Sequence, residues 1–125
     1  MNPSRIGSIA EAKVLATAST LGWNVSIPFG DGLPYDLVVE REGKLYRVQC
    51  KTGRLRDGVV KFADYSDDHK SYDGLVDVIA VFCHQNEKLY WIPASEGGMA
   101  HLRIDPPKNG QRKKIRYAKD FEVGV

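Results

Sequence analysis

Two apolar runs on either side of the dipeptide Glu42-Gly43 constrain the fold of this chain most strongly. The first run covers residues 35–40 and the second covers residues 44–52. A short connection that ends in glycine, between two runs of strand-like alternation, is typical of a β-hairpin. The sequence therefore predicts two neighbouring antiparallel strands, and the register of one strand sets which side chains face those of the other.

The predicted hairpin carries a small set of polar groups. Asp36 stands at the head of the first strand, and Gln49, Cys50 and Lys51 follow one another in the second. Side chains of a strand alternate between faces, so Gln49 and Lys51 share one face and Cys50 lies on the other. We expect a carboxylate, an amide oxygen and an ammonium to meet on one side of one sheet. Such groups can hold a hard metal ion beside a water molecule, which suits phosphodiester hydrolysis.

The rest of the chain predicts one leading helix and then further strands. Apolar residues recur at helical spacing over residues 6–21, with Ser4 as the expected N-cap and Gly22 as the end. Polar and glycine-rich segments, including residues 53–58, read as loops. Short alternating or continuous apolar runs predict strands at residues 23–27, 59–63, 76–83, 88–92 and 101–104, and a short closing helix is expected at residues 117–121. This order predicts an α/β fold (α+β on a strict count), with a leading helix and a mixed central β-sheet with flanking helices.

Length and composition indicate one domain over residues 1–125. The net charge of +2 neither indicates nor excludes a nucleic-acid partner. Cys50 and Cys83 lie in apolar runs without zinc-site spacing, which indicates reduced, buried thiols in a cytoplasmic protein. No run has the length of a membrane span or the pattern of a signal peptide, so no membrane partner is expected.

Basic residues gather at two places. Arg54, Arg56 and Lys61 follow Lys51 closely and are candidate phosphate contacts at the mouth of the predicted site. The densest basic run contains Arg112, Lys113, Lys114 and Arg116. Each residue on its own is as readily an ordinary surface charge. If these residues contact nucleic acid, binding should depend strongly on salt.

The order and spacing of the polar residues resemble the PD-(D/E)xK nuclease superfamily. The matching elements are Glu11 in the leading helix, the segment Pro34-Tyr-Asp36 at a strand head, and Gln49-Cys-Lys51 on the next strand. The later segments 72–82, 89–93, 102–111 and 118–121 are similar to one branch, the bacterial group I intron-encoded homing endonucleases of the restriction fold. The first half is also similar to archaeal Holliday junction resolvases.

This resemblance implies a site and a cofactor. Glu11, Asp36, Gln49 and the backbone carbonyl of Cys50 would bind Mg²⁺ or Mn²⁺, and Lys51 would be the catalytic lysine. The superfamily usually has Glu or Asp where this chain has Gln49, so the site would hold two formal negative charges in place of three. The resemblance thus implies a metal-dependent, site-specific endonuclease of the homing type that acts on double-stranded DNA. A small domain with one site cuts one strand, so a homo-oligomer, dimer or tetramer, is expected.

Three other functions stay open at the level of sequence. The same fold would serve a structure-selective Holliday junction resolvase. It would also serve a catalytically silent DNA-binding module, for which Gln49 is the discriminating residue. A plain α/β interaction domain that binds no nucleic acid is the remaining alternative.

Overall fold

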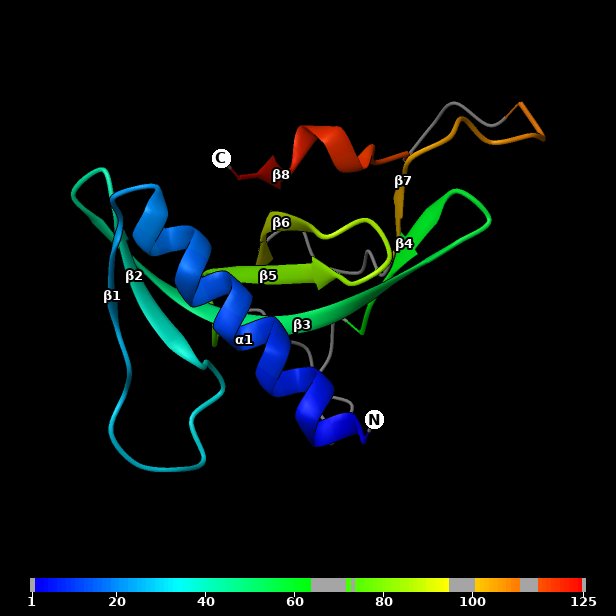
Figure 1. The fold of residues 1–125 in the computed structure, drawn as a ribbon. Coiled ribbons are helices and arrows are strands. Elements are labelled where there is room, and N and C mark those ends of the chain that lie inside the picture. The colour runs from blue at the N-terminus through cyan, green and yellow to red at the C-terminus, as the bar shows by residue number, and fades with distance from the viewer. Residues whose placement is uncertain (1, 64–71, 73, 95–100, 111–114, 125) are drawn as a thin grey trace.

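A single α-helix lies across one face of a mixed β-sheet (Figure 1). The computed structural model describes residues 2–63, 72, 74–94, 101–110 and 115–124. The helix is α1 (Pro3–Thr20), and a short 3-10 helix, η2 (Ala118–Asp120), lies near the C-terminus. The strands are β1 (Asn24–Ser26), β2 (Leu37–Arg41), β3 (Lys44–Arg56), β4 (Val59–Lys61), β5 (Val78–Cys83), β6 (Lys88–Pro93), β7 (His101–Arg103) and β8 (Glu122–Val123). The predicted α+β architecture is confirmed, although α1 is the one α-helix among the described residues.

Helix α1 begins earlier than expected. The predicted N-cap at Ser4 is wrong, because the Asn2 side chain accepts a hydrogen bond from the Arg5 N–H at 2.9 Å. Pro3 takes the first helical position, where its missing N–H costs nothing. Gly22, with a φ of 82°, follows the last turn and ends the helix as predicted.

The sheet places β3 and β5 at its centre. Its strand order is β1-β2-β3-β5-β6-β8, with β3 and β5 parallel and the other pairs antiparallel. Strand β1 lies at the edge, as its short sequence ending at Pro28 indicated. All six residues of β5 are buried, which confirms the prediction of a strand covered on both faces.

The core has one cluster of apolar side chains on each face of the sheet. The cluster under α1 includes Val14, Val48 and Phe82. The cluster on the opposite face includes Val60, Tyr72, Val81 and Leu102. The alternation along β3 and β5 therefore divides the protein into an α1 face and an opposite face.

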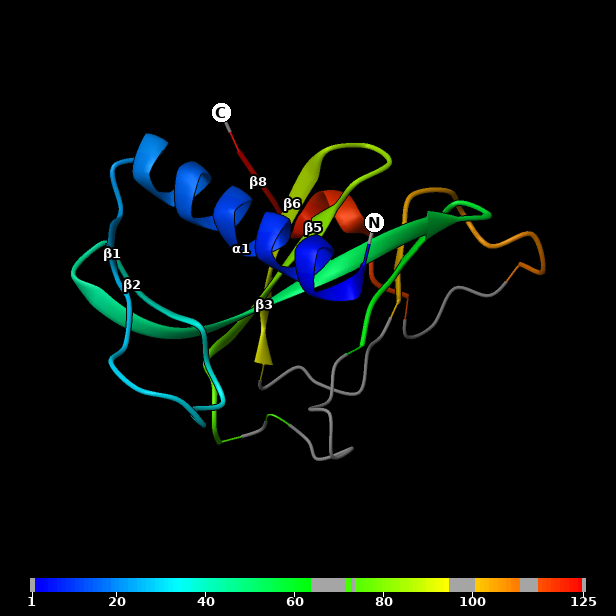
Figure 2. The ribbon, with the colours of Figure 1, turned by 60° about the horizontal axis from the view of Figure 1, so that its bottom comes forward.

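Strand β3 is longer than predicted. Residues 53–56, expected to be loop, continue the strand and pair with β4 in the register Arg54↔Lys61 and Arg56↔Val59. The turn is confined to Asp57 and Gly58, whose φ angles of 53° and 75° match a two-residue hairpin turn. The Asp-Gly dipeptide between alternating residues is the signal that identifies this turn. Strand β4 also pairs with β7, so β3, β4 and β7 form an extension at one end of the sheet (Figure 2).

An ion pair holds the start of β5 against β3. The Asp77 carboxylate accepts hydrogen bonds from the Arg47 backbone N–H at 2.7 Å and from its guanidinium at 3.1 Å. The Asp77 N–H donates in turn to the Arg47 carbonyl. Asp77 thereby helps to set the parallel register that places β5 beside Gln49 and Lys51.

Part of the predicted surface lies outside the described residues. Arg112, Lys113 and Lys114 belong to that part of the chain. Among the described residues, no helix is both long and apolar enough to cross a membrane.

Candidate active site

Asp36 lies immediately before β2, at the end of that strand and beside β3. Its N–H donates to the Val48 carbonyl at 2.8 Å, and its carboxylate accepts the Cys50 N–H at 2.9 Å. The pairing of β2 with β3 reaches only as far as Leu37↔Val48. Beyond that pair, the Asp36 carboxylate accepts the Cys50 N–H, which the backbone of a longer strand would otherwise accept. The carboxylate is thus held by the backbone of the strand that also carries Gln49 and Lys51.

A short length of the β3 edge has no described strand beside it. Strand β2 covers this edge as far as Val48, and β4 covers it again from Arg54. The N–H and C=O of one strand residue point to the same edge. The Cys50 N–H points to Asp36, so the Cys50 carbonyl faces the same gap. The backbone oxygen named from the sequence as a metal ligand therefore lies on the Asp36 side of β3.

Glu11 approaches this edge from α1. It lines a shallow pocket of about 310 Å³ together with Ser8 of the helix, Leu37 of β2 and Ile27 of the preceding loop. Burial raises the pKa of Glu11, and the nearby charge of Asp36 raises it further. The helix and the strand therefore bring two carboxylates into electrostatic contact, although the residues are far apart in sequence.

The pKa of Asp36 is also raised, chiefly by burial. The hydrogen bond from Cys50 and the positive charge of Lys51 act in the opposite direction. Two carboxylates drawn together in a half-buried position favour a bound cation, because its charge would offset both the repulsion and the loss of hydration.

The oxygen donors present fit a hard divalent cation. They are the carboxylates of Glu11 and Asp36, the amide oxygen of Gln49 and the carbonyl of Cys50. No group of three or more His, Cys, Asp or Glu residues suited to a metal occurs in the described part of the chain. A metal held here would therefore rely on two acids, with neutral oxygens and water completing its shell.

Gln49 and Lys51 lie on the face of β3 opposite α1. Their register neighbours on β5, Ile79 and Val81, belong to the core cluster of that face. The Lys51 ammonium lies 5.1 Å from the centre of the Tyr72 ring. The expected alternation is confirmed, but the groups do not share one side of the sheet: Glu11 comes from the α1 face, Lys51 from the opposite face, and Asp36 lies between them at the edge.

The Cys50 side chain points to the α1 face of the sheet, away from Gln49 and Lys51. It packs against the cluster under α1, while the backbone of Cys50 faces Asp36. Burial raises the pKa of the thiol far above its usual range, and the charges of Asp36 and Glu11 add to the rise. The thiol therefore stays protonated, and only the backbone of this residue is suited to the site. Cys83 is fully buried, as predicted, whereas Cys50 is half-buried.

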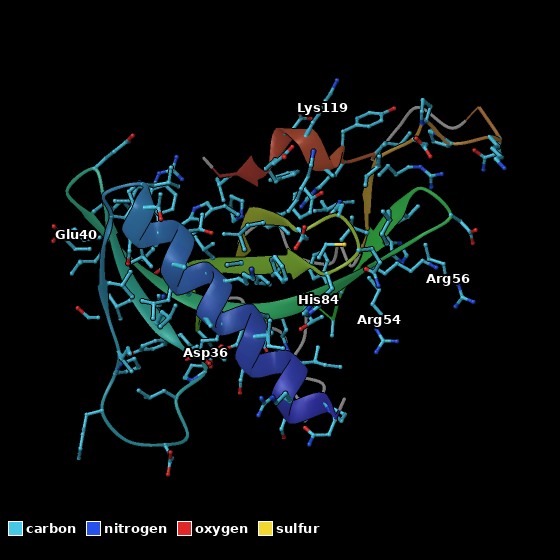
Figure 3. All side chains as sticks on the ribbon, in the orientation of Figure 1. Asp36, Glu40, Arg54, Arg56, His84 and Lys119 are labelled. Carbon is cyan, nitrogen blue, oxygen red and sulfur yellow. The ribbon has the colours of Figure 1, made fainter. Side chains whose placement is uncertain are left out.

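The predicted phosphate contacts next to Lys51 are exposed. Arg54, Arg56 and Lys61 lie on the β3–β4 hairpin, and Figure 3 shows Arg54 and Arg56 pointing away from the sheet. Arg116 lies beside β7, where its backbone carbonyl accepts the Arg103 N–H at 2.8 Å, and its side chain is half-buried.

Sequence reasoning missed three residues near these positions. Thr52 lines a pocket together with Arg54 and Arg56, and His101 and Arg103 lie across β4 from the β3 arginines. Both segments alternate basic and apolar residues, as Arg-Leu-Arg at residues 54–56 and His-Leu-Arg at residues 101–103, and this shared alternation is the signal for them in the sequence. Each segment pairs with β4.

Comparison with known proteins agrees with this geometry. A family model described as PD-(D/E)XK endonuclease matches residues 1–124. The structure is similar to that of the bacterial homing endonuclease I-Ssp6803I, with a TM-score of 0.72 at 22% identity, covering 97% of this chain and 86% of the other. No curated protein matches the chain in sequence. The fold is thus restriction-endonuclease-like, and the chain belongs to the PD-(D/E)XK endonuclease family.

Proposed function

We propose that this chain is a metal-dependent endonuclease that hydrolyses phosphodiester bonds in double-stranded DNA at specific sites, as a homing-type enzyme does. The observation that carries the proposal is the Asp36 carboxylate held by the Cys50 N–H at an open strand edge, in electrostatic contact with Glu11 and Lys51. Nucleases of this family generally use divalent metals, and a DNA substrate follows from the family. We propose Mg²⁺, or Mn²⁺ in its place, as the cofactor.

Each side chain has a defined part in this proposal. Glu11, Asp36 and Gln49 would hold the cation, together with the Cys50 carbonyl. When bound, the cation would polarise a phosphoryl oxygen and lower the pKa of a coordinated water. Lys51 would orient the attacking water and offset charge that develops on the phosphoryl oxygens. The Tyr72 ring would position the Lys51 ammonium by packing against it.

Cutting both strands requires more than one copy of this site. One domain of 125 residues with one site cuts one strand, so we propose a homo-oligomer, either a dimer or a tetramer. The similarity to a homing endonuclease supports the site-specific form of the activity. The free thiols Cys50 and Cys83 agree with a cytoplasmic location.

A cleavage assay with matched lysine variants tests the proposal. Plasmid and randomised duplex DNA would be incubated with the protein and Mg²⁺ or Mn²⁺, and cut ends would be sequenced. Lys51→Ala and Asp36→Asn should each lower the cleavage rate by about 100-fold or more. Lys44→Ala removes an exposed lysine from the same strand and should leave the rate unchanged. If Lys51→Ala and Asp36→Asn cut as fast as the parent protein, the proposed site is wrong.

Metal binding separates an active enzyme from a silent module. Mg²⁺ should raise the unfolding temperature of the parent protein and not that of Asp36→Asn. Gln49→Glu should strengthen the metal-dependent shift, because it adds a third carboxylate. Absence of any shift in both the parent and Gln49→Glu would favour a silent DNA-binding module. Preferential cutting of a four-way junction over linear duplex would favour a resolvase.

A further inference from the structure

A basic surface continues the open edge of β3 beyond the proposed site. Side chains on three adjacent strands meet in two rows, given by the registers Arg54↔Lys61↔His101 and Arg56↔Val59↔Arg103. The row between them, Leu55↔Val60↔Leu102, points into the core, where Val60 and Leu102 are fully buried. Alternation therefore directs the basic side chains of β3, β4 and β7 to one face. We call this face the basic ribbon, made of Arg54, Arg56, Lys61, His101 and Arg103.

The basic ribbon has a concave surface and a rigid support. A groove of about 420 Å³ is lined by Thr52, Arg54, Arg56, Lys61 and His101, among others. At the tip of the hairpin, the Gly58 carbonyl accepts the N–H groups of Ile104 and Asp105, at 2.8 and 3.2 Å. Of the acids in the described part of the chain, Asp57 and Asp105 lie at the tip, where they line a different pocket together with Gly58. These bonds fix the backbone at the tip of the ribbon before any ligand binds.

The groove is continuous with the proposed active site. Thr52 lines it and is the next residue along the open edge after Cys50, whose N–H binds Asp36. A strand rises by about 3.3 Å per residue, so Arg54 and Arg56 lie about 10 and 17 Å beyond Lys51. Duplex DNA rises by about 3.4 Å per base pair along one strand. DNA that follows β3 would therefore present to Arg54 and Arg56 the base pairs about three and five steps from the cut.

We propose that the basic ribbon is the sequence-reading element of this enzyme, in which Arg54 and Arg56 contact base edges in the major groove about three to five base pairs from the cleaved bond. Strands of a β-sheet can read the major groove, and arginine pairs with the two acceptors of guanine there. Lys61 on the middle strand β4, and His101 and Arg103 on β7, contact phosphates and set the register. The proposal rests on the DNA endonuclease function proposed above and assigns the residues that choose the site.

Cleavage of a randomised duplex library tests this assignment, because each sequenced end gives the distance from the cut. The parent protein should prefer guanine within about three to five base pairs of the cut. Arg54→Ala and Arg56→Ala should each lower one of these preferences by about 5- to 100-fold and leave the others unchanged. If both variants keep the preferences of the parent, or lose affinity equally for all sequences, the base-reading role is refuted. A parent protein without preference at these positions refutes it as well.

Binding measurements separate this proposal from the proposed function. Lys61→Ala should reduce the slope of log binding constant against log salt by about 0.9, the value for one phosphate contact. Lys44→Ala is the matched control, since the exposed Lys44 begins β3 at the end opposite Arg54 and Arg56, and its slope should equal that of the parent. Equal slopes for both variants would refute the phosphate contact even if the protein cuts DNA. A difference between them with no cleavage under Mg²⁺ or Mn²⁺ would support the ribbon and refute the nuclease activity.

Discussion

Gly53 is the residue at which β3 passes from its pairing with β5 to its pairing with β4. It is the last residue of β3 in register with β5, and Arg54 is the first in register with β4. A Cβ atom at Gly53 would lie 2.7 Å from Val81 Cγ1 and 2.9 Å from Val60 Cγ1. Carbon atoms in good contact lie about 3.5–4.0 Å apart. Gly53→Ala therefore forces two strands apart in the core.

The expected cost follows from how little these neighbours can move. Val60 and Val81 are both fully buried, and each lies in a strand hydrogen-bonded to β3. Overpacking of a core by one methyl group costs about 1–3 kcal/mol. Alanine also lowers the conformational entropy of the unfolded chain, which offsets this cost by about 0.4–1 kcal/mol. We expect Gly53→Ala to lose about 1–2 kcal/mol of unfolding free energy, or about 4–8 °C in unfolding temperature for a domain of this size.

Urea and thermal unfolding followed by circular dichroism measure this loss. Gly7→Ala is the matched control, because Gly7 lies within α1 and its added Cβ would meet nothing within 4 Å. The same substitution should there stabilise the protein by about 0.5–1 kcal/mol. The same glycine-to-alanine change should thus lower the free energy of unfolding at Gly53 and raise it at Gly7.

A double substitution identifies the contact responsible. Val60→Ala alone opens a cavity and should destabilise the protein. In the Gly53→Ala background it also removes Cγ1 from the crowded space, so the double variant should be less destabilised than the sum of the single changes. Gly53→Ala should also slow cleavage, because it shifts Lys51 relative to Arg54. Parent-like stability of Gly53→Ala, or strictly additive effects in the double variant, would refute the reasoning.

Three further predictions concern an ion pair, a thiol and a helix cap. Hydrogen bonds from Arg47 lower the pKa of Asp77 in the folded protein. The ionised carboxylate therefore stabilises the fold fully above the ordinary carboxyl pKa of 3.8, and this stabilisation is lost as pH falls through the lower pKa of the folded state. Asp77→Asn should therefore unfold in less urea than the parent at pH 7, and this difference should close below about pH 4. The Cys50 thiol should react with iodoacetamide at pH 8 only after unfolding in urea, and rapid labelling of the native protein would contradict its raised pKa. Asn2→Ala should lower the unfolding free energy by about 1 kcal/mol by removing the cap of α1, whereas Ser4→Ala should change it little.

Local pattern was sufficient for most of the elements. The buried run at β5, the edge position of β1 and the hairpin at Glu42-Gly43 were all predicted from alternation and turn residues. The prediction of a loop at residues 53–58 was wrong for residues 53–56, because the two glycines and three charges of this segment outweighed the strand alternation between them. Gly53 stays in the strand because of a contact across the sheet, with Val60 and Val81, that no local pattern contains.

The sequence by itself determined the groups available for chemistry. It placed Asp36 at a strand head and Lys51 two residues after Gln49, and alternation alone put the Cys50 side chain on the other face. Only the tertiary structure decided where these groups meet, since Glu11 and Lys51 approach from opposite faces and Asp36 joins them at the edge where β2 ends. The physical reason is that side-chain direction follows from local backbone geometry, whereas the end of one strand beside another depends on pairing between distant segments.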